Sequence, residues 1–222
     1  MDSSPLNETQ DGDESVSPAP RKSRTQAERR AEAERRMLQA AVRILAEKGF
    51  AALTLNEVGE AAGYSRGLPA HYFGRKDELL LAVGRYIVSR FSKGLRRPRN
   101  EPPLEGLPAI LRTADYYLAS VGQDPVTMRA LLVILTETTS HPDLFPALVE
   151  LNRASVDGFA EQIRIGQRQG EIGPEIDPAS HAVLILGQLR GIVTQWLIDR
   201  STVDLDRVRA SVALSLRRSL AP

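Results

Sequence analysis

Apolar residues recur at helical spacing through most of the 222-residue chain. Between Arg24 and Gly49 there is neither Gly nor Pro, and five apolar positions fall on one helical face: Met37, Leu38, Ala41, Val42 and Leu45. A second stripe begins near Lys76 and ends before Pro98: Leu80, Val83, Ile87, Phe91 and Leu95. No segment alternates with period two between hairpin turns. The pattern therefore predicts an all-α chain with about nine or ten helices.

A short helix with a clear start is predicted between these two stripes. Thr54 and Glu57 have the spacing of a capping box, in which each side chain bonds the other residue's backbone N–H. Leu53 and Val58 occupy the hydrophobic-staple positions on either side of the cap. Gly63 ends this helix.

A third helix follows almost at once. Only one residue separates the glycine from Ser65, a good cap for a helix that runs to about Phe73 and is broken by Gly74. Two short helices joined by a tight Gly-containing turn, behind a longer helix, are typical of a helix-turn-helix. In that motif the second short helix enters the major groove of DNA.

The C-terminal half continues as helices separated by three breaks, at residues 122–125, 141–146 and 170–178. Residues 179–197 are apolar nearly all round, so this helix must be covered on more than one side. The last helix carries a single apolar stripe. We therefore expect both helices to pack against their symmetry copies in a four-helix dimer interface that includes Leu189, Ile192, Trp196 and Leu216.

Charge is distributed unevenly along a chain whose net charge is only +1. Residues 1–20 hold five acids and no Lys or Arg, whereas residues 21–100 hold eighteen basic residues against eight acids. Residues 101–222 hold eleven basic residues against fifteen acids. The first 22 residues contain little to bury and are expected to form a disordered acidic tail. A basic segment inside a nearly neutral chain is the footprint of a nucleic-acid-binding domain.

The compartment follows from what the sequence lacks. There is no Cys, which excludes disulfides and thiolate sites and favours a reducing compartment. The polar start does not look like a signal peptide. The longest notable apolar stretch, Ala182 to Gly187, is far shorter than the ~18 residues of a membrane span. We expect a cytoplasmic protein that makes no membrane contact and associates with the nucleoid when bound to DNA.

The run from Ala40 to Leu81 resembles the DNA-binding region of the tetracycline-repressor (TetR) family. The matching residues stand in the family's order and spacing: Gly49, Phe50, Thr54, Glu57, Val58, Ala62, Gly63, Ser65, Gly67, Tyr72, Phe73, Lys76, Glu78 and Leu79. Residues 170–220 resemble the dimer-forming end of the family more loosely. The resemblance implies a helix-turn-helix domain over residues 23–75 and a ligand-binding, dimerising domain over 76–222. It also implies a repressor that a small-molecule effector releases from a palindromic operator.

Three residues depart from the family pattern. Gly59 stands where the family usually has Ala, at a cost of about 1 kcal/mol in helix propensity. Pro69 lies four residues after the Ser65 cap, where its missing N–H is expected to remove a helical hydrogen bond. Ala70 replaces a Tyr that often contacts a phosphate, so His71 or Tyr72 is expected to supply that contact.

The helical wheel assigns roles to the groove-facing residues. With Tyr64, Pro69 and Phe73 inward, Arg66 is placed for a bidentate contact to guanine, and Leu68 and Ala70 for thymine methyl groups. Thr54 and Lys76 stand at helix starts that suit phosphate. A flexible arm with Arg21, Lys22 and Arg24 is a candidate for the minor groove. The predicted DNA contacts are Thr54, Ser65, Arg66, Gly67, Leu68, Ala70, His71, Tyr72 and Lys76.

An effector pocket needs semi-polar or aromatic residues on otherwise apolar helices. Seven residues of the second domain fit that description: Tyr116, Tyr117, Met128, Thr136, Phe159, Gln188 and Trp196. Two alternatives remain open at this stage. One is a helical DNA-binding protein without an effector, and the other is a ligand-binding module that has lost DNA binding.

Enzyme motifs are present only by chance spacing. Tyr72 and Lys76 form a Tyr-x-x-x-Lys pair, but a dinucleotide fingerprint would have to follow a strand well upstream of it. The three His, at positions 71, 141 and 181, lie far apart in sequence and lack metal-ligand spacing. We therefore expect no catalysis, no metal and no cofactor. The expected partners are double-stranded DNA, a second copy of the chain and an unidentified small molecule.

Overall fold

The computed structural model describes Met1 and residues 25–95, 101–140 and 145–222. The expected acidic tail and basic arm lie outside these residues, as does His141. The described chain forms nine helices and no strands: α1 Gln26–Lys48, α2 Leu55–Ala61, α3 Leu68–Phe73, α4 Lys76–Leu95, α5 Gly106–Gln123, α6 Pro125–Ser140, α7 Pro146–Arg168, α8 Pro178–Ile198 and α9 Leu205–Leu220. The all-α prediction is confirmed.

Local signals explain where the longer helices begin and end. Thr25 and Glu28 form a capping box on α1, with the Glu28 N–H donating to Thr25 Oγ1 at 3.2 Å and the Thr25 N–H donating to Glu28 Oε2 at 2.8 Å. Gly49 ends α1 with φ at 79°, a left-handed value that favours glycine. At the other end of the chain, Asp177 caps α8 by accepting from the Ser180 N–H at 2.8 Å.

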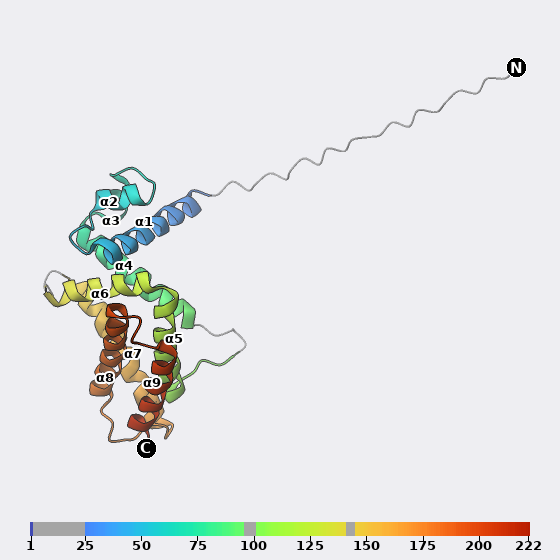
Figure 1. The fold of residues 1–222 in the computed structure, drawn as a ribbon, viewed down its shortest axis with the longest axis vertical. Coiled ribbons are helices and arrows are strands. Elements are labelled where there is room, and N and C mark those ends of the chain that lie inside the picture. Colours follow the sequence, from blue (N-terminus) through green and yellow to red (C-terminus); the bar gives the residue numbers. More distant parts are fainter. Residues whose placement is uncertain (2–24, 96–100, 141–144) are drawn as a thin grey trace.

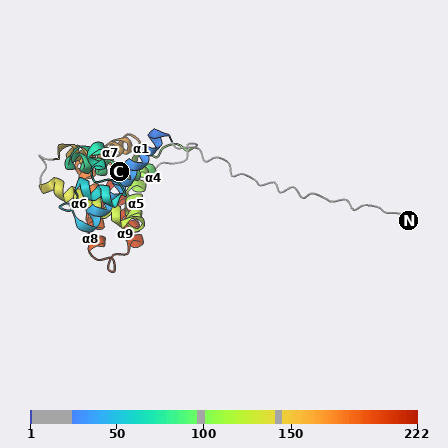
Figure 2. The ribbon, with the colours of Figure 1, turned by 90° about the horizontal axis from the view of Figure 1, so that it is seen from above.

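The helices form a head and a body (Figure 1). The head, α1 to α3, lies at one end, and α4 leads from it into the body, α5 to α9. Helices α5, α7, α8 and α9 run lengthwise, whereas α6 lies crosswise beneath α1. Figure 2, looking down on the molecule from the head, shows the head lying over the body. Helix α6 therefore occupies the junction between the two parts.

Two apolar clusters fill the interior. One lies among α5, α7, α8 and α9 and includes Ile110, Leu118 and Ile163. The other begins in the head, with Met37 and Val58, and continues without interruption into α6 and α7. The α6 and α7 members of this second cluster, together with Phe145 just before α7, are Ala130, Ile134, Phe145 and Leu148. The core of the head is thus completed by the body.

Helix α8 has the length and apolar composition of a membrane span, with a mean hydropathy of 1.2 over 18 residues. Only a third of that window is buried within the chain. Its buried side packs against the body core through Ala182, Ile185 and Leu189. Its other side exposes Val183 and Leu184 at 56% and 63%. The helix is therefore covered on one side and open along the other.

Candidate nucleic-acid interface and ligand cavity

The connection between α2 and α3 is a compact turn held by backbone hydrogen bonds. Gly63 has φ at 78°, and the N–H of Tyr64 donates to the Gly59 carbonyl at 2.8 Å. The Leu68 N–H donates to the Ser65 carbonyl at 3.1 Å. The third helix therefore begins at Leu68, not directly after Ser65 as expected. Gly67 occupies the cap position and makes no side-chain cap bond.

This later start changes the role of Pro69. As the second residue of α3, Pro69 stands where the backbone N–H has no partner inside the helix. The prediction that it removes a helical hydrogen bond was wrong. Pro69 and Phe73 are buried, as the helical wheel predicted, and Tyr64 is half-buried.

Gly59 and Pro69, two of the departures from the family pattern, are in contact. A Cβ atom placed on Gly59 would lie 2.6 Å from the Ser65 carbonyl oxygen and 3.2 Å from Pro69 Cδ. The first distance is far shorter than a van der Waals contact between carbon and oxygen. Gly59 is therefore required by the close approach of the turn, a role that the sequence alone did not reveal.

The residues predicted to face the groove lie on the outer side of α3 and of the turn before it. Arg66, Gly67, Ala70 and His71 are exposed, and Leu68 is half-buried. The Arg66 side chain is 72% exposed and pairs with Glu60. A Cβ on Gly67 would meet nothing within 4 Å. This face is open to a partner that approaches closely.

Tyr72 and Ser65 lie at the edges of this face. Tyr72 is half-buried, with the guanidinium of Arg30 from α1 at 5.5 Å from its ring centroid, so the ring links α3 to α1. Ser65 is exposed.

Thr54 caps α2 by accepting from the Glu57 N–H at 3.1 Å. The reciprocal half of the predicted capping box is absent, because the Glu57 carboxylate accepts from Lys48 Nζ at 2.6 Å instead. This hydrogen bond from the lysine lowers the pKa of the Glu57 carboxyl. Leu53 and Val58, at the staple positions, are fully buried.

Lys76 turns its ammonium group inward. Its Nζ donates to the Phe50 carbonyl at 2.8 Å and lies 3.8 Å from the centroid of the Phe50 ring. Burial lowers the pKa of this ammonium group. Phe50 in turn makes an edge contact with Phe145, at 6.1 Å between ring centroids. Lys76 therefore ties the start of α4 to the loop after α1, and its predicted phosphate contact would require this hydrogen bond to be exchanged.

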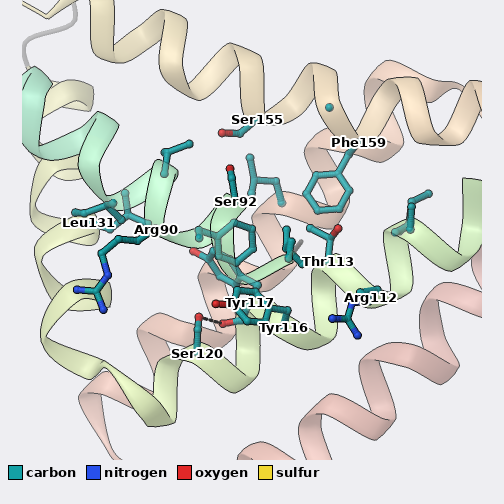
Figure 3. Close-up of a pocket in the computed structure, with 18 of the residues that line it drawn as sticks. Arg90, Ser92, Arg112, Thr113, Tyr116, Tyr117, Ser120, Leu131, Ser155 and Phe159 are labelled. Carbon is teal, nitrogen blue, oxygen red and sulfur yellow. Dashed lines mark hydrogen bonds between the residues drawn. The ribbon is translucent and has the colours of Figure 1, made fainter. Parts of the chain in front are cut away.

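The body contains a cavity of about 1040 Å³ between α4, α5, α6, α7 and α8. Figure 3 shows Tyr116 and Tyr117 reaching it from α5 and Phe159 from α7. Met128 lines it from α6. Four of the seven predicted ligand residues are thus brought together around one space.

The other three lie elsewhere. The Thr136 hydroxyl donates to the Leu132 carbonyl at 2.9 Å within α6, and Gln188 is exposed on the outer side of α8. Trp196 is buried in the body core beneath Arg200, whose guanidinium lies 4.6 Å from the ring centroid. None of the three lines the cavity.

Arg190 also lines the cavity but was not among the residues predicted to contact a ligand. It is the only charged residue between Ala182 and Ile198. A charge inside so long an apolar run was the available signal.

The predicted dimer residues need correction as well. Leu189, Trp196 and Leu216 are 1%, 9% and 3% exposed, so they belong to the core of a single chain. Ile192 is half-buried. The apolar side chains that α8 and α9 leave at the surface are Val183, Leu184, Ile198 and Leu214. The three buried residues therefore cannot form an interface, and the assignment of α8 and α9 to a dimer stays a prediction.

Among the described residues, no three His, Asp or Glu side chains are grouped as metal ligands would be.

Two family models together match most of the chain. Residues 37–83 match the bacterial regulatory proteins, tetR family, and residues 108–221 match the BetI-type transcriptional repressor, C-terminal. Among curated proteins, the HTH-type transcriptional regulator CymR of Pseudomonas putida is 41% identical over 194 residues, covering 86% of this chain and 92% of the relative. UidR of Escherichia coli K12 is 30% identical over 186 residues, covering 82% and 88%.

Solved structures share the fold at lower identity. FadR of Bacillus subtilis, in complex with stearoyl-CoA, superposes with a TM-score of 0.70 at 19% identity and covers 84% of this chain and 98% of its own. A Saccharomonospora viridis protein in complex with choline also gives 0.70, at 20% identity, with coverages of 86% and 99%.

Proposed function

Because the chain belongs to the TetR family of DNA-binding bacterial transcriptional regulators, we propose that it is a homodimeric repressor released from a palindromic operator by a small molecule. The observation that carries this proposal is the combination of an exposed α3 face with a large cavity in the body. The cavity also favours this function over that of a DNA-binding protein without an effector. Such a repressor acts in the cytoplasm.

On the DNA side, Arg66 is the base-reading residue of the proposal. Its guanidinium is exposed and pairs with the exposed Glu60, an ion pair that water or a base edge can replace at little cost. A bidentate contact to guanine is the commonest specific arginine contact in the major groove. Gly67 and Ala70 let the backbone approach the groove closely, His71 follows Ala70 on α3, and Thr54 stands exposed at the start of α2. The α3 start at Leu68 is consistent with this role, since the N-terminal end of a recognition helix is the part that reads bases.

The dimer of this proposal is formed by the open sides of α8 and α9. Leu184 and Ile198 stand on the same side of α8, separated by Gly187 and Gly191, where an added Cβ would meet nothing within 4 Å. Small residues at that position let a second helix approach closely. Leu214 supplies the apolar centre of the exposed face of α9, 49% exposed. Two such helix pairs make the four-helix interface expected of the family.

Effector and operator are coupled through two helices that connect the cavity to the head. Helix α4 carries Phe91 in the cavity and begins at Lys76, directly after the head. Helix α6 lines the cavity with Met128 and packs Ala130 and Ile134 into the core of the head. A ligand that displaces either helix changes the separation of the two recognition helices, which must stay near 34–36 Å to span one turn of DNA. The coupling free energy cannot exceed the difference in the ligand's binding free energy between the DNA-binding state and the released state. Such coupling is typically 1–3 kcal/mol.

The test is binding to the intergenic DNA upstream of the protein's own gene, measured by fluorescence anisotropy with an unrelated duplex of equal length as control. We expect specific binding by a dimer at nanomolar to tens-of-nanomolar concentrations, roughly 10³-fold or more tighter than to the control. Equal affinity for both duplexes would show that the intergenic DNA upstream of the gene contains no operator for this protein. A full set of upstream fragments that all bind like the control would favour a ligand-binding module without an operator.

A further inference from the structure

A half-buried cation lines the cavity and makes no ion pair within the described part of the chain. Arg190 reaches the cavity from the middle of α8, and its Nη1 donates to the Asn152 amide oxygen at 2.6 Å. Its Nε is buried and has no hydrogen-bond partner. Among the described residues, no ion pair includes Arg190. Burial lowers the pKa of this guanidinium, but an arginine stays protonated in proteins.

A second unsatisfied donor stands beside the first. Tyr117 is 8% exposed, and its hydroxyl is buried without a hydrogen-bond partner. Burial raises the pKa of this phenol, while the adjacent Arg190 opposes the shift through its positive charge and through a weak side-chain interaction with the hydroxyl. The hydroxyl therefore stays protonated and able to donate. Arg190 and Tyr117 thus stand side by side, and neither Arg190 Nε nor the Tyr117 hydroxyl makes a well-formed hydrogen bond. Because buried polar groups in native proteins are nearly always satisfied, one ligand group that accepts from both would complete them.

Four other charged residues line the cavity, two of them acidic. Asp124 pairs with Arg90 at 3.4 Å and caps α6 through Thr127. Arg112 is exposed. Glu101 lines the cavity from the loop before α5, whereas Arg190 lies on α8. The five charged lining residues thus carry one net positive charge, and Arg190 is the one whose Nε is buried without a partner.

The rest of the wall is apolar and aromatic. Phe91 lies 5.1 Å from Tyr116 and 5.6 Å from Tyr117, measured between ring centroids. Phe159 and Met128 complete this surface, at 8% and 5% exposure. In Figure 3 the ring of Phe159 points from α7 toward the two tyrosines of α5. A ligand body held here must be apolar, flat or flexible, and larger than a few atoms.

We propose that the effector is a carboxylate, with its oxygens bound by the Arg190 guanidinium and the Tyr117 hydroxyl and its aromatic or aliphatic body packed against Phe91, Tyr116 and Phe159. This inference rests on the proposed effector function and names its ligand class. A carboxylate matches the planar donor edge of arginine and cancels one charge. A neutral ligand would leave the charge unmatched, and a cationic one would meet no buried anion.

The fold does not decide this chemistry, because relatives of this shape are named with ligands of different charge. Choline is a cation, whereas stearoyl-CoA carries phosphates, and both accompany structures of this fold. The choice in this chain is made by its own side chains. A phosphate dianion would bring two negative charges to a single buried cation, so the match is better for a carboxylate.

The test pairs each acid with its neutral analogue. Benzoate, 3-phenylpropionate, decanoate and palmitate are compared with their primary amides, and decanoate also with decyl phosphate, by titration calorimetry and by the shift of the melting temperature. We expect at least one carboxylate to bind and its amide not to. Arg190→Met should weaken that binding roughly 10- to 100-fold, and Tyr117→Phe by about 3- to 10-fold. Arg153→Met, an exposed arginine on α7 next to Asn152, is the matched control and should change binding less than twofold.

Three results would overturn the proposal: binding by the amides as tight as by the acids, preference for decyl phosphate over decanoate, or no binding by any of the four carboxylates. A ligand-free measurement adds a fourth. If Arg190 is kept for ligand binding, Arg190→Met relieves an unsatisfied buried charge and raises the melting temperature of the empty protein. A lowered melting temperature would assign Arg190 to the structure of the body instead.

DNA binding separates this inference from the function on which it rests. Arg190→Met should bind the upstream operator as the native chain does, and only its release by the carboxylate should be lost. If the native chain binds no operator but does bind a carboxylate through Arg190, the repressor proposal fails and the ligand class stands. If the native chain binds the operator but no carboxylate, the repressor proposal stands and the proposed ligand class fails.

Discussion

The core of the head is closely packed, whereas the core of the body is interrupted by a cavity. In the head, Met37, Leu45, Leu53 and Val58 are fully buried, and the described residues contain no buried side-chain polar atom without a partner. The body holds a cavity of about 1040 Å³ and both of the unsatisfied polar atoms. Close packing fixes the position of a short recognition helix, whereas incomplete packing leaves room for a ligand. The head is thus closely packed, whereas the body leaves a space that a ligand could fill.

The largest expected effect separates the two sides of α8. Leu189→Asp places a charge in the body core, at a position 1% exposed, and should cost at least about 4 kcal/mol of folding stability. Leu184→Asp, at a position 63% exposed, should leave the fold intact and convert the dimer to a monomer. Circular dichroism melting measures the first effect, and sedimentation at micromolar concentration measures the second. A Leu184→Asp protein that still sediments as a dimer would place the interface elsewhere.

Gly59 tests how tightly the head is packed. Gly59→Ala gains about 1 kcal/mol of helix propensity but forces a Cβ to 2.6 Å from the Ser65 carbonyl oxygen. We expect a net loss of about 1–3 kcal/mol in urea unfolding. Gly158→Ala is the control in the body, because a Cβ there meets nothing within 4 Å and should stabilise α7 by up to about 1 kcal/mol. Similar increases in the free energy of unfolding from both substitutions would mean that the turn between α2 and α3 can accommodate a Cβ at position 59.

Substitutions at Arg66 and Lys76 test whether the first residue reads a base and the second contacts a phosphate. Arg66→Ala should cost about 1–3 kcal/mol of operator binding and relax the preference at one base pair, and Arg66→Lys should recover little of it. Lys76→Ala should weaken binding to all sequences and lower the slope of affinity against salt by about one if the ammonium reaches a phosphate. Because Nζ is bonded to Phe50, we also expect a lower melting temperature. Salt titrations in which Arg66→Ala behaves like Lys76→Ala would contradict base reading.

The smallest effects concern the start of α2. Thr54→Ala should cost about 1 kcal/mol of stability, and Thr54→Ser should restore most of it. The lowered pKa of Glu57 means that its ion pair with Lys48 is fully formed above the ordinary carboxyl pKa and is lost as the pH falls through the lowered value. Glu57→Gln should therefore lose stability less steeply than the native protein below about pH 5. Parallel acid unfolding curves would show that this pair contributes nothing measurable.

The sequence was informative where structure is determined locally. The glycines at 49, 63 and 74 and the cap at Thr54 placed the helices of the head, because capping and left-handed turns depend on adjacent residues. The start of α3 was misplaced by two residues, since a Ser with a free hydroxyl looks like a cap whether or not the helix begins there. Close contacts across the turn, such as that of Gly59, require the tertiary arrangement.

The body was less predictable because its sites are assembled from distant segments. The cavity takes residues from five helices, and nothing in the local pattern separates Met128, which lines it, from Thr136, which does not. Helix α8 is apolar all round, so periodicity could not tell the side facing the chain's own core from the side left exposed. Leu189 and Leu184 are equivalent in sequence terms and opposite in space.

The continuity of the core from the head into α6 and α7 limits how this protein can be recombined with its relatives. Cutting the chain after residue 75 would strip α1 of Ala130, Ile134, Phe145 and Leu148, which share a cluster with Met37 and Leu45. A chimeric regulator made by joining this head to another body at that point would expose those surfaces or meet a mismatched α6. Exchange of DNA specificity is therefore easier by replacing residues on the outer face of α3 than by transplanting the head. In an evolving gene family, the same constraint makes operator preference drift by point substitution while head and α6 are inherited together.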